Sequence, residues 1–304
     1  MGTKFSARVG YIGLGGMGRG LVKNMLKHGI DVTVNDLNQQ AVSNVIELGA
    51  KSESDILAIA GDVDVLGICI TTAEAVQSLM LGEDGALSMM KSGAVLLDNT
   101  TTSPEHVETM ASACERLGVR YCEAPMTRTP MHADRGEVNI LFGGEEDLLA
   151  ELTPLFETYA ENIFHVGPAG HAIRLKLIHN YIAFTNVLSW CEGFALAAKD
   201  GLDMTKVIGI ISAAGGKSGM MDLYGEATLN RDFAQHISLD NAMKDVRYYA
   251  RWLEQAGLPG FVADSVHQMY ALASNKGHGD EGCTAVIKAY EELTGIEARL
   301  PPKS

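Results

Sequence analysis

The residues with the clearest chemical meaning form a glycine-rich loop near the N-terminus. The loop consists of Gly13, Leu14, Gly15, Gly16, Met17 and Gly18, and it joins an apolar run to a helical pattern. In such a strand-turn-helix the first glycine permits the tight turn, the second admits a pyrophosphate to the backbone, and the third allows close packing. Exposed N–H groups at the helix start then bind the diphosphate. The spacing predicts a dinucleotide site; the alternative is a tight turn without a ligand.

An acidic residue ends the next predicted strand. Asp36 lies 18 residues beyond Gly18, close to the spacing of a carboxylate that binds ribose hydroxyls. Its charge would repel a 2′-phosphate, so we expect NAD, as NADH in reduction, rather than NADP. The alternative is that Asp36 only caps the helix that follows.

A second group of candidate residues lies in the middle of the chain. Lys176 and Asn180 are four residues apart, so on a helix they share one face. Apolar neighbours, among them Ile173 and Leu177, indicate that this helix is largely buried. Burial disfavours the charged form of a lysine and brings its pKa toward neutrality, which suits proton transfer. The alternative is a lysine whose ammonium reaches the solvent.

The first half of the chain alternates short β-branched runs with amphipathic segments, which is typical of βαβ units and a parallel sheet. Strands are predicted at 8–12, 31–35, 65–70, 94–98, 120–123 and 138–142, and helices at 17–28, 38–48, 73–79 and 104–117. After Pro168 no proline occurs until Pro259, and apolar residues recur at spacings of three and four. Helices are predicted there at 171–199, 205–213, 239–255, 262–275 and 283–293.

These elements predict an α/β fold in three parts. Residues 1–166 should form a dinucleotide-binding Rossmann domain with a doubly wound parallel sheet. Residues 167–200 should form a long interdomain helix, and residues 201–304 an all-α C-terminal domain for substrate binding and oligomerisation.

The bulk composition limits the partners of this 304-residue chain. Its 24 Lys and Arg against 38 Asp and Glu give a formal charge of −14, which would repel nucleic acid and anionic membranes. No apolar run reaches the roughly 18 to 20 residues of a membrane span. The five cysteines are scattered and form no CxxC pair, so reduced thiols and no metal site are expected. We expect a cytoplasmic protein with a small-molecule substrate.

Four blocks, in the right order, resemble the β-hydroxyacid dehydrogenase family, which includes 3-hydroxyisobutyrate dehydrogenase and several semialdehyde reductases. The blocks are residues 13–18, the Asp-Asn-Thr-Thr-Thr-Ser-Pro of 98–104, the Glu-Ala-Pro-Met-Thr of 123–127, and the Gly-Pro-Ala-Gly of 167–170 followed by Lys176 and Asn180. A looser fifth block is 243–246. The resemblance covers nearly the whole chain and implies an NAD-dependent oxidoreductase, a homodimer or homotetramer, that moves a hydride between nicotinamide and a small anionic β-hydroxyacid or its semialdehyde.

The resemblance also implies roles for particular residues. Lys176 would donate a proton to the nascent alkoxide in reduction and accept it back in oxidation, and Asn180 would orient the substrate. Lys244 would approach the nicotinamide end of the cofactor, with a solvated surface lysine as the alternative. Further cofactor contacts are implied at the ends of two strands, namely Ile70, Thr71, Thr72, Thr100 and Thr101. For Thr100 and Thr101 the alternative is a turn before a helix that starts at Ser103 and Pro104.

The substrate block departs from the family pattern. Relatives commonly have Ser-Gly-Gly where this chain has Thr127, Arg128 and Thr129. An arginine offers a fixed fork of donors to an anion, and this arrangement resembles the branch that reduces sulfolactaldehyde. Arg128 could instead face solvent or pair with an acid, and the substrate could be 3-hydroxyisobutyrate, tartronate semialdehyde or succinic semialdehyde. An imine reductase or a non-catalytic NAD-binding homologue is less expected, because Lys176 and Asn180 are both present.

Overall fold

The computed structural model describes residues 5–82, 84–234 and 237–301. The chain divides into two compact units, Met1–Lys176 and Leu177–Ser304. The division falls inside the segment predicted as an interdomain helix. Within the described residues, no helix combines the length and the apolar character needed to cross a bilayer.

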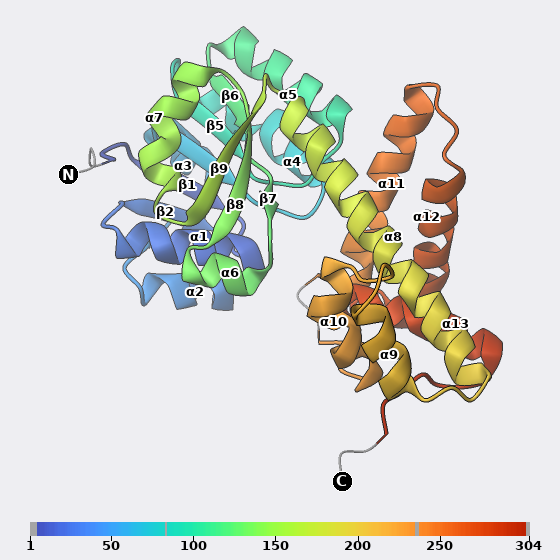
Figure 1. Ribbon diagram of the computed structural model, residues 1–304. Coiled ribbons are helices and arrows are strands. Elements are labelled where there is room, and N and C mark those ends of the chain that lie inside the picture. The colour runs from blue at the N-terminus through green and yellow to red at the C-terminus, as the bar shows by residue number, and fades with distance from the viewer. Residues whose placement is uncertain (1–4, 83, 235–236, 302–304) are drawn as a thin grey trace. The chain divides into compact units, whose positions relative to one another are not determined.

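The first unit contains one sheet, and the amino-terminal part of that sheet confirms the Rossmann prediction (Figure 1). Its strands are β1 (Val9–Ile12), β2 (Val32–Asn35), β3 (Lys51–Ser52), β4 (Val65–Ile68), β5 (Val95–Asp98), β6 (Arg120–Glu123), β7 (Met126–Thr127), β8 (Val138–Gly143) and β9 (Ala160–Gly167). The strands β3-β2-β1-β4-β5-β6 lie side by side and are all parallel, which is the order of a dinucleotide-binding sheet. The predicted strand β8 is antiparallel to β6 and β7, and it carries the parallel strand β9 on its other side.

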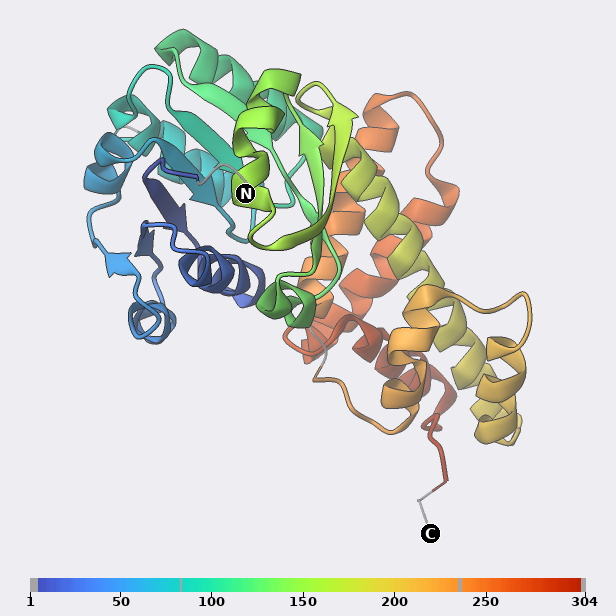
Figure 2. The ribbon, with the colours of Figure 1, turned by 60° about the vertical axis from the view of Figure 1, so that its left-hand side comes forward.

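Helices cover both faces of this sheet, as Figure 2 shows. They are α1 (Gly16–Lys27), α2 (Gln39–Ile46), α3 (Ile56–Asp62), α4 (Ala73–Leu81), α5 (Pro104–Leu117), α6 (Pro130–Arg135) and α7 (Glu146–Phe156). Successive strand residues face opposite sides, so Val65 packs in one apolar core with α1 and α7, while Leu66 packs in another with α3, α4 and α5. Parallel strands buried on both faces bring their carboxyl ends to a single edge, where ligands bind in such sheets.

The second unit is all helical. Its elements are the continuation of α8 (His171–Lys199), then α9 (Met204–Ser212), α10 (Gly219–Leu229), α11 (Leu239–Gln255), α12 (Phe261–Ala273) and α13 (Ile287–Thr294), with short turns at Ser274–His278 and Cys283–Val286. The 29 residues of α8 and the 17 residues of α11 match the predicted ranges. Phe184, Phe194 and Tyr270 contribute to one buried apolar cluster.

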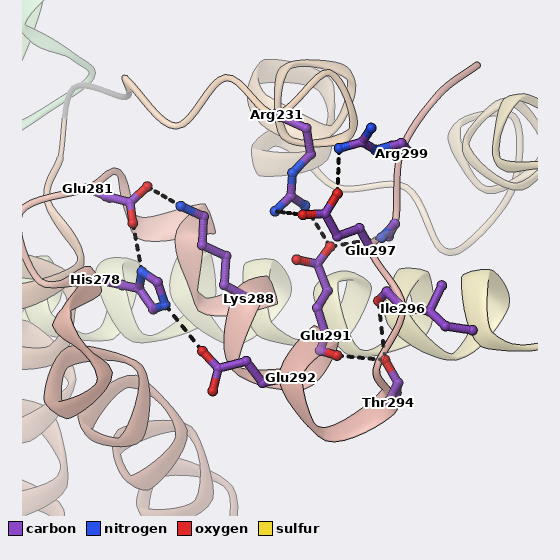
Figure 3. Close-up of polar contacts among 11 residues, drawn as sticks. Arg231, His278, Glu281, Lys288, Glu291, Glu292, Thr294, Ile296, Glu297 and Arg299 are labelled. Atoms are coloured by element: carbon purple, nitrogen blue, oxygen red, sulfur yellow. Dashed lines mark hydrogen bonds and ion pairs between the residues drawn. The ribbon is translucent and has the colours of Figure 1, made fainter. Parts of the chain in front are cut away.

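Ion pairs hold the C-terminal segment of this unit against α13 and the end of α10 (Figure 3). The carboxylate of Glu291 accepts hydrogen bonds from Arg231 Nη1 at 2.6 Å and from the backbone N–H of Ala298 at 2.8 Å. Only 6% of Glu291 is exposed. Removal of its arginine would leave a buried carboxylate without its counter-charge, which is strongly destabilising. The segment near Ala298 is therefore part of the folded unit.

Candidate active site

The three motif glycines meet different surroundings. Gly13 has a φ of +98°, and a Cβ there would lie 2.2 Å from the carbonyl oxygen of Cys69. A Cβ at Gly18 would lie 2.1 Å from the carbonyl oxygen of Gly13. Around a Cβ at Gly15 no described atom lies within 4 Å. A side chain at Gly15 would therefore extend into open space.

The start of α1 adjoins this space. Its N-cap, Gly15, gives no side-chain hydrogen bond to the helix, and the first turn contains no acidic residue. The first N–H groups of a helix have no partner within the helix, and they carry the positive end of its dipole. The loop and the helix start together fit the diphosphate of a dinucleotide.

Asp36 faces the glycine loop. One carboxylate oxygen accepts a hydrogen bond from the backbone N–H of Leu14 at 2.5 Å, and the other accepts one from Asn38 at 2.7 Å. The N-cap of α2 is Asn38, whose side chain accepts from the backbone N–H groups of Gln40 and Ala41. Asp36 is therefore not the capping residue. A carboxylate has about four acceptor positions, so about two remain for other donors.

The ends of β4 and β5 bring two predicted cofactor segments together. The hydroxyl of Thr100 accepts a hydrogen bond from the backbone N–H of Ile70 at 3.3 Å. The backbone N–H of Thr100 donates to the carboxylate of Asp98 at 2.8 Å. Thr72 caps α4 through Ala75. Thr71 is exposed and Thr101 half-buried. The alternative prediction of a helix start after this turn is confirmed, because Ser103 caps α5.

The substrate block lies beside the glycine loop. Thr129 is the N-cap residue of α6, although its side chain makes no capping hydrogen bond. A Cβ added at Gly16 would lie 3.0 Å from the side chain of Pro130, the first residue of α6. Thr127, at the end of β7, accepts a hydrogen bond from Asn139 at 3.0 Å. The structure therefore places the predicted substrate loop and the predicted pyrophosphate loop next to each other.

Arg128 pairs with an acid in this structure, as one of its predicted alternatives stated. Its Nη1 donates to the backbone carbonyl of Glu137 at 2.6 Å and forms an ion pair with Glu161 on β9. Its backbone has a φ of +79°, in the left-handed region that favours the glycine common in relatives.

Glu123 is a buried carboxylate that the sequence reasoning did not single out. It ends β6, is 2% exposed, and accepts hydrogen bonds from the backbone N–H groups of Gly170 at 2.7 Å, Ala172 at 2.9 Å and Ile173 at 3.2 Å. These groups form the start of α8. Burial raises the pKa of Glu123 to about 7, although the three donors act to lower it. A Cβ at Gly143 would lie 2.4 Å from the carboxylate, so glycine makes room for it.

Lys176 and Asn180 lie one turn apart on α8 and are 8% and 5% exposed. In the second unit, Asn180 Nδ2 donates to Asp245 at 2.6 Å, and its side-chain oxygen lies 2.9 Å from His179 Nδ1. The other oxygen of Asp245 lies 3.3 Å from Lys244 Nζ.

Lys244 is buried in the second unit. It is 8% exposed, and its Nζ lies 5.6 Å above the ring centre of Tyr248. The alternative of a solvated surface lysine is therefore wrong for Lys244. Asp245 joins it to Asn180, a link that the sequence reasoning missed although Lys244 and Asp245 both lie in the block 243–246. Among the described residues, no group of three or more His, Cys, Asp or Glu is placed to bind a metal ion.

Two family models match the chain over nearly its whole length. Residues 8–167 match the NAD-binding domain of 6-phosphogluconate dehydrogenase, and residues 169–290 match the NAD-binding domain of NADP-dependent 3-hydroxyisobutyrate dehydrogenase. The chain belongs to the β-hydroxyacid dehydrogenase family. As a member of that family, it is an NAD-binding oxidoreductase that acts on a hydroxyl group.

Individual relatives act on different acids. The chain is 29% identical to 2-(hydroxymethyl)glutarate dehydrogenase of Eubacterium barkeri, over 96% of this chain and 97% of the relative. It is 24% identical to 3-sulfolactaldehyde reductase of Escherichia coli, over 97% and 99%. The solved structure of 3-hydroxyisobutyrate dehydrogenase from Salmonella typhimurium is 28% identical and superposes with a TM-score of 0.84, over 92% of this chain and 99% of that one. The relatives support hydroxyacids as the substrate class.

Proposed function

We propose that this protein uses NADH to reduce a small anionic semialdehyde to its β-hydroxyacid, or catalyses the reverse oxidation. The observation that carries the proposal is Lys176, a buried amine on a face of α8 that it shares with Asn180. A buried amine is suited to exchange a proton with a substrate oxygen. The experiment that tests the proposal is NADH oxidation with semialdehydes of matched length that carry a carboxylate, a sulfonate or a phosphate. Binding of NADH without turnover of any of them would identify a non-catalytic homologue instead.

Each predicted residue has a place in this proposal. The nicotinamide cofactor, when bound, supplies or accepts the hydride. The residues of the glycine loop hold its diphosphate, and Asp36 accepts hydrogen bonds from a ribose. Thr100, Thr101 and the segment 70–72 line the strand ends on the nicotinamide side. Lys176 holds the proton that the substrate oxygen receives, Asn180 orients that oxygen, and Lys244 approaches the nicotinamide.

Asp36 sets the preference for NADH in this proposal, because its carboxylate would repel the 2′-phosphate of NADPH. Asp36→Ala is expected to reduce the ratio of kcat/KM for NADH to that for NADPH by at least about tenfold, the effect of roughly 1.4 kcal/mol. Steady-state kinetics with both cofactors measure this ratio. If the wild type used the two cofactors equally, Asp36 would not determine a preference for NADH.

The substrate head that we propose is a sulfonate, with sulfolactaldehyde as the first candidate. The support is Arg128, which adds a guanidinium to a loop next to the pyrophosphate loop. A carboxylate, as in 3-hydroxyisobutyrate, tartronate semialdehyde or succinic semialdehyde, is the alternative. Glu161 already pairs with Arg128, so an anionic substrate would have to compete with that acid.

Substitution of Arg128 separates these cases. Arg128→Gly is expected to fold, because glycine accepts a φ of +79° without strain. If Arg128 binds the sulfonate, kcat/KM should fall about tenfold or more for the sulfonate alone, since hydrogen bonds to charged groups contribute about 1.5 to 3 kcal/mol. Glu161→Gln, which removes the competing charge and keeps the arginine, should retain or improve that value. An equal loss for all acids in Arg128→Gly would assign Arg128 to loop structure.

A further inference from the structure

We propose that Glu123 is a positioning residue for Lys176: it fixes the first turn of α8 and thereby the place of the proton-donating amine. The inference rests on the proposed role of Lys176. Glu123 itself need not touch substrate or cofactor.

The carboxylate of Glu123 is hydrogen-bonded to the first turn of α8. Its two oxygens accept three hydrogen bonds, from the backbone N–H groups of Gly170, Ala172 and Ile173. These N–H groups belong to the part of a helix that has no internal acceptor. A carboxylate is also the favoured group at the positive end of a helix. Burial disfavours the charged form of Glu123, and the three N–H donors offset part of that cost, so the carboxyl group and the helix start stabilise each other.

Two glycines bracket Pro168 and Ala169 in the segment that leads into α8, and Gly167 is the last residue of β9. Gly167 and Gly170 both have positive φ values, +138° and +94°. Glycine loses more conformational freedom on ordering than any other residue, so the direction in which the chain enters the helix depends on outside contacts. Glu123 is the last residue of β6, which lies between β5 and β8, and it connects this entry to the sheet of the unit.

Lys176 follows closely along the same helix. It lies six residues after Gly170, a rise of about 9 Å at 1.5 Å per residue, and it belongs to the same compact unit as Glu123. A helix moves as a rigid body over so short a length, so a shift of its first turn moves the amine. A misplacement of about 1 Å at a reacting group can cost on the order of 10²-fold in rate.

The test compares Glu123→Gln with Glu123→Asp. The glutamine has the same shape but presents an N–H₂ group to one of the three donors and carries no charge. We expect its kcat to fall about tenfold while KM for NADH stays within about twofold, because the glycine loop lies on another helix. Aspartate keeps the charge on a shorter side chain and should restore part of kcat. Asp55→Asn makes the same acid-to-amide change at the N-cap of α3, where asparagine can still accept the capping hydrogen bond; it is the matched control and should retain native kcat per folded molecule.

A second measurement does not depend on activity. Amide hydrogen exchange at Gly170, Ala172 and Ile173 should become faster in Glu123→Gln and stay native in Asp55→Asn. Native kcat in Glu123→Gln would overturn the inference. If the glutamine variant fails to fold, native kcat in Glu123→Asp would overturn it. The inference would also be overturned if Glu123→Gln lost no more kcat than Asp55→Asn when the two variants lose the same stability. If Lys176→Ala remains active, the proposed function itself fails, whatever the Glu123 variants show.

Discussion

Lys176→Ala is expected to lose between about 10² and 10⁴ in kcat, the usual contribution of general acid-base catalysis, and to bind NADH as the wild type does. The amine is buried on α8, whereas the glycine loop proposed to hold the cofactor leads into α1 and remains unchanged. Single-turnover reduction of the preferred semialdehyde, together with NADH titration by fluorescence, measures the two quantities separately.

The control for this experiment lies on the same helix. Lys199 is the exposed last residue of α8, and Lys199→Ala removes an amine of the same kind without a buried environment. Its turnover should stay native. Native turnover in Lys176→Ala would require another proton donor, and the mechanism proposed for this site would be wrong.

Gly15→Ala and Gly18→Ala are expected to lose different properties: the first should lose NADH affinity and the second stability. At Gly15 the backbone is extended, with φ −61° and ψ −172°, and no described atom lies near the added methyl group. This variant should fold normally and bind NADH at least about tenfold more weakly, because the methyl group occupies the space that the pyrophosphate needs.

At Gly18 the same methyl group would meet the carbonyl oxygen of Gly13 at 2.1 Å. The expected loss is therefore in stability, about 1 to 3 kcal/mol as for other overpacked sites. Thermal melting without cofactor and NADH titration distinguish the two variants. Native NADH affinity in Gly15→Ala would show that the diphosphate does not lie against this loop.

The elements that were predicted well are those whose signal is local. The helices α8 and α11 have long periodic apolar patterns, and the buried strands β1, β4 and β5 have short apolar runs. The sequence reasoning missed α7, which contains Pro154, and α10, which contains two glycines. Proline and glycine lower helix propensity, and in both helices buried side chains override it. The strand β9 was missed because its residues are half-exposed or exposed, without alternating apolar positions.

The site also contains local features, which the sequence predicts, and contacts between distant residues, which it does not. The turn at the glycine loop and the approach of Asp36 to it were predictable, because both lie within one βαβ unit. The partners of Asn180, Arg128 and the start of α8 lie 65, 33 and about 50 residues away in sequence. No periodicity or spacing connects residues at such separations, so Asp245, Glu161 and Glu123 could be found only from the fold.

The close approach of Gly143 to Glu123 restricts which substitutions the chain can accept. Alanine at position 143 would place its methyl group 2.4 Å from the carboxylate, so it cannot enter while the glutamate keeps its present position. Aspartate in place of Glu123 would be shorter by one methylene. Exchange of Glu123 for aspartate would open space beside position 143, and alanine there could in turn fill the space. The two positions, on neighbouring strands, are therefore expected to change together during divergence, with glutamate accompanied by glycine.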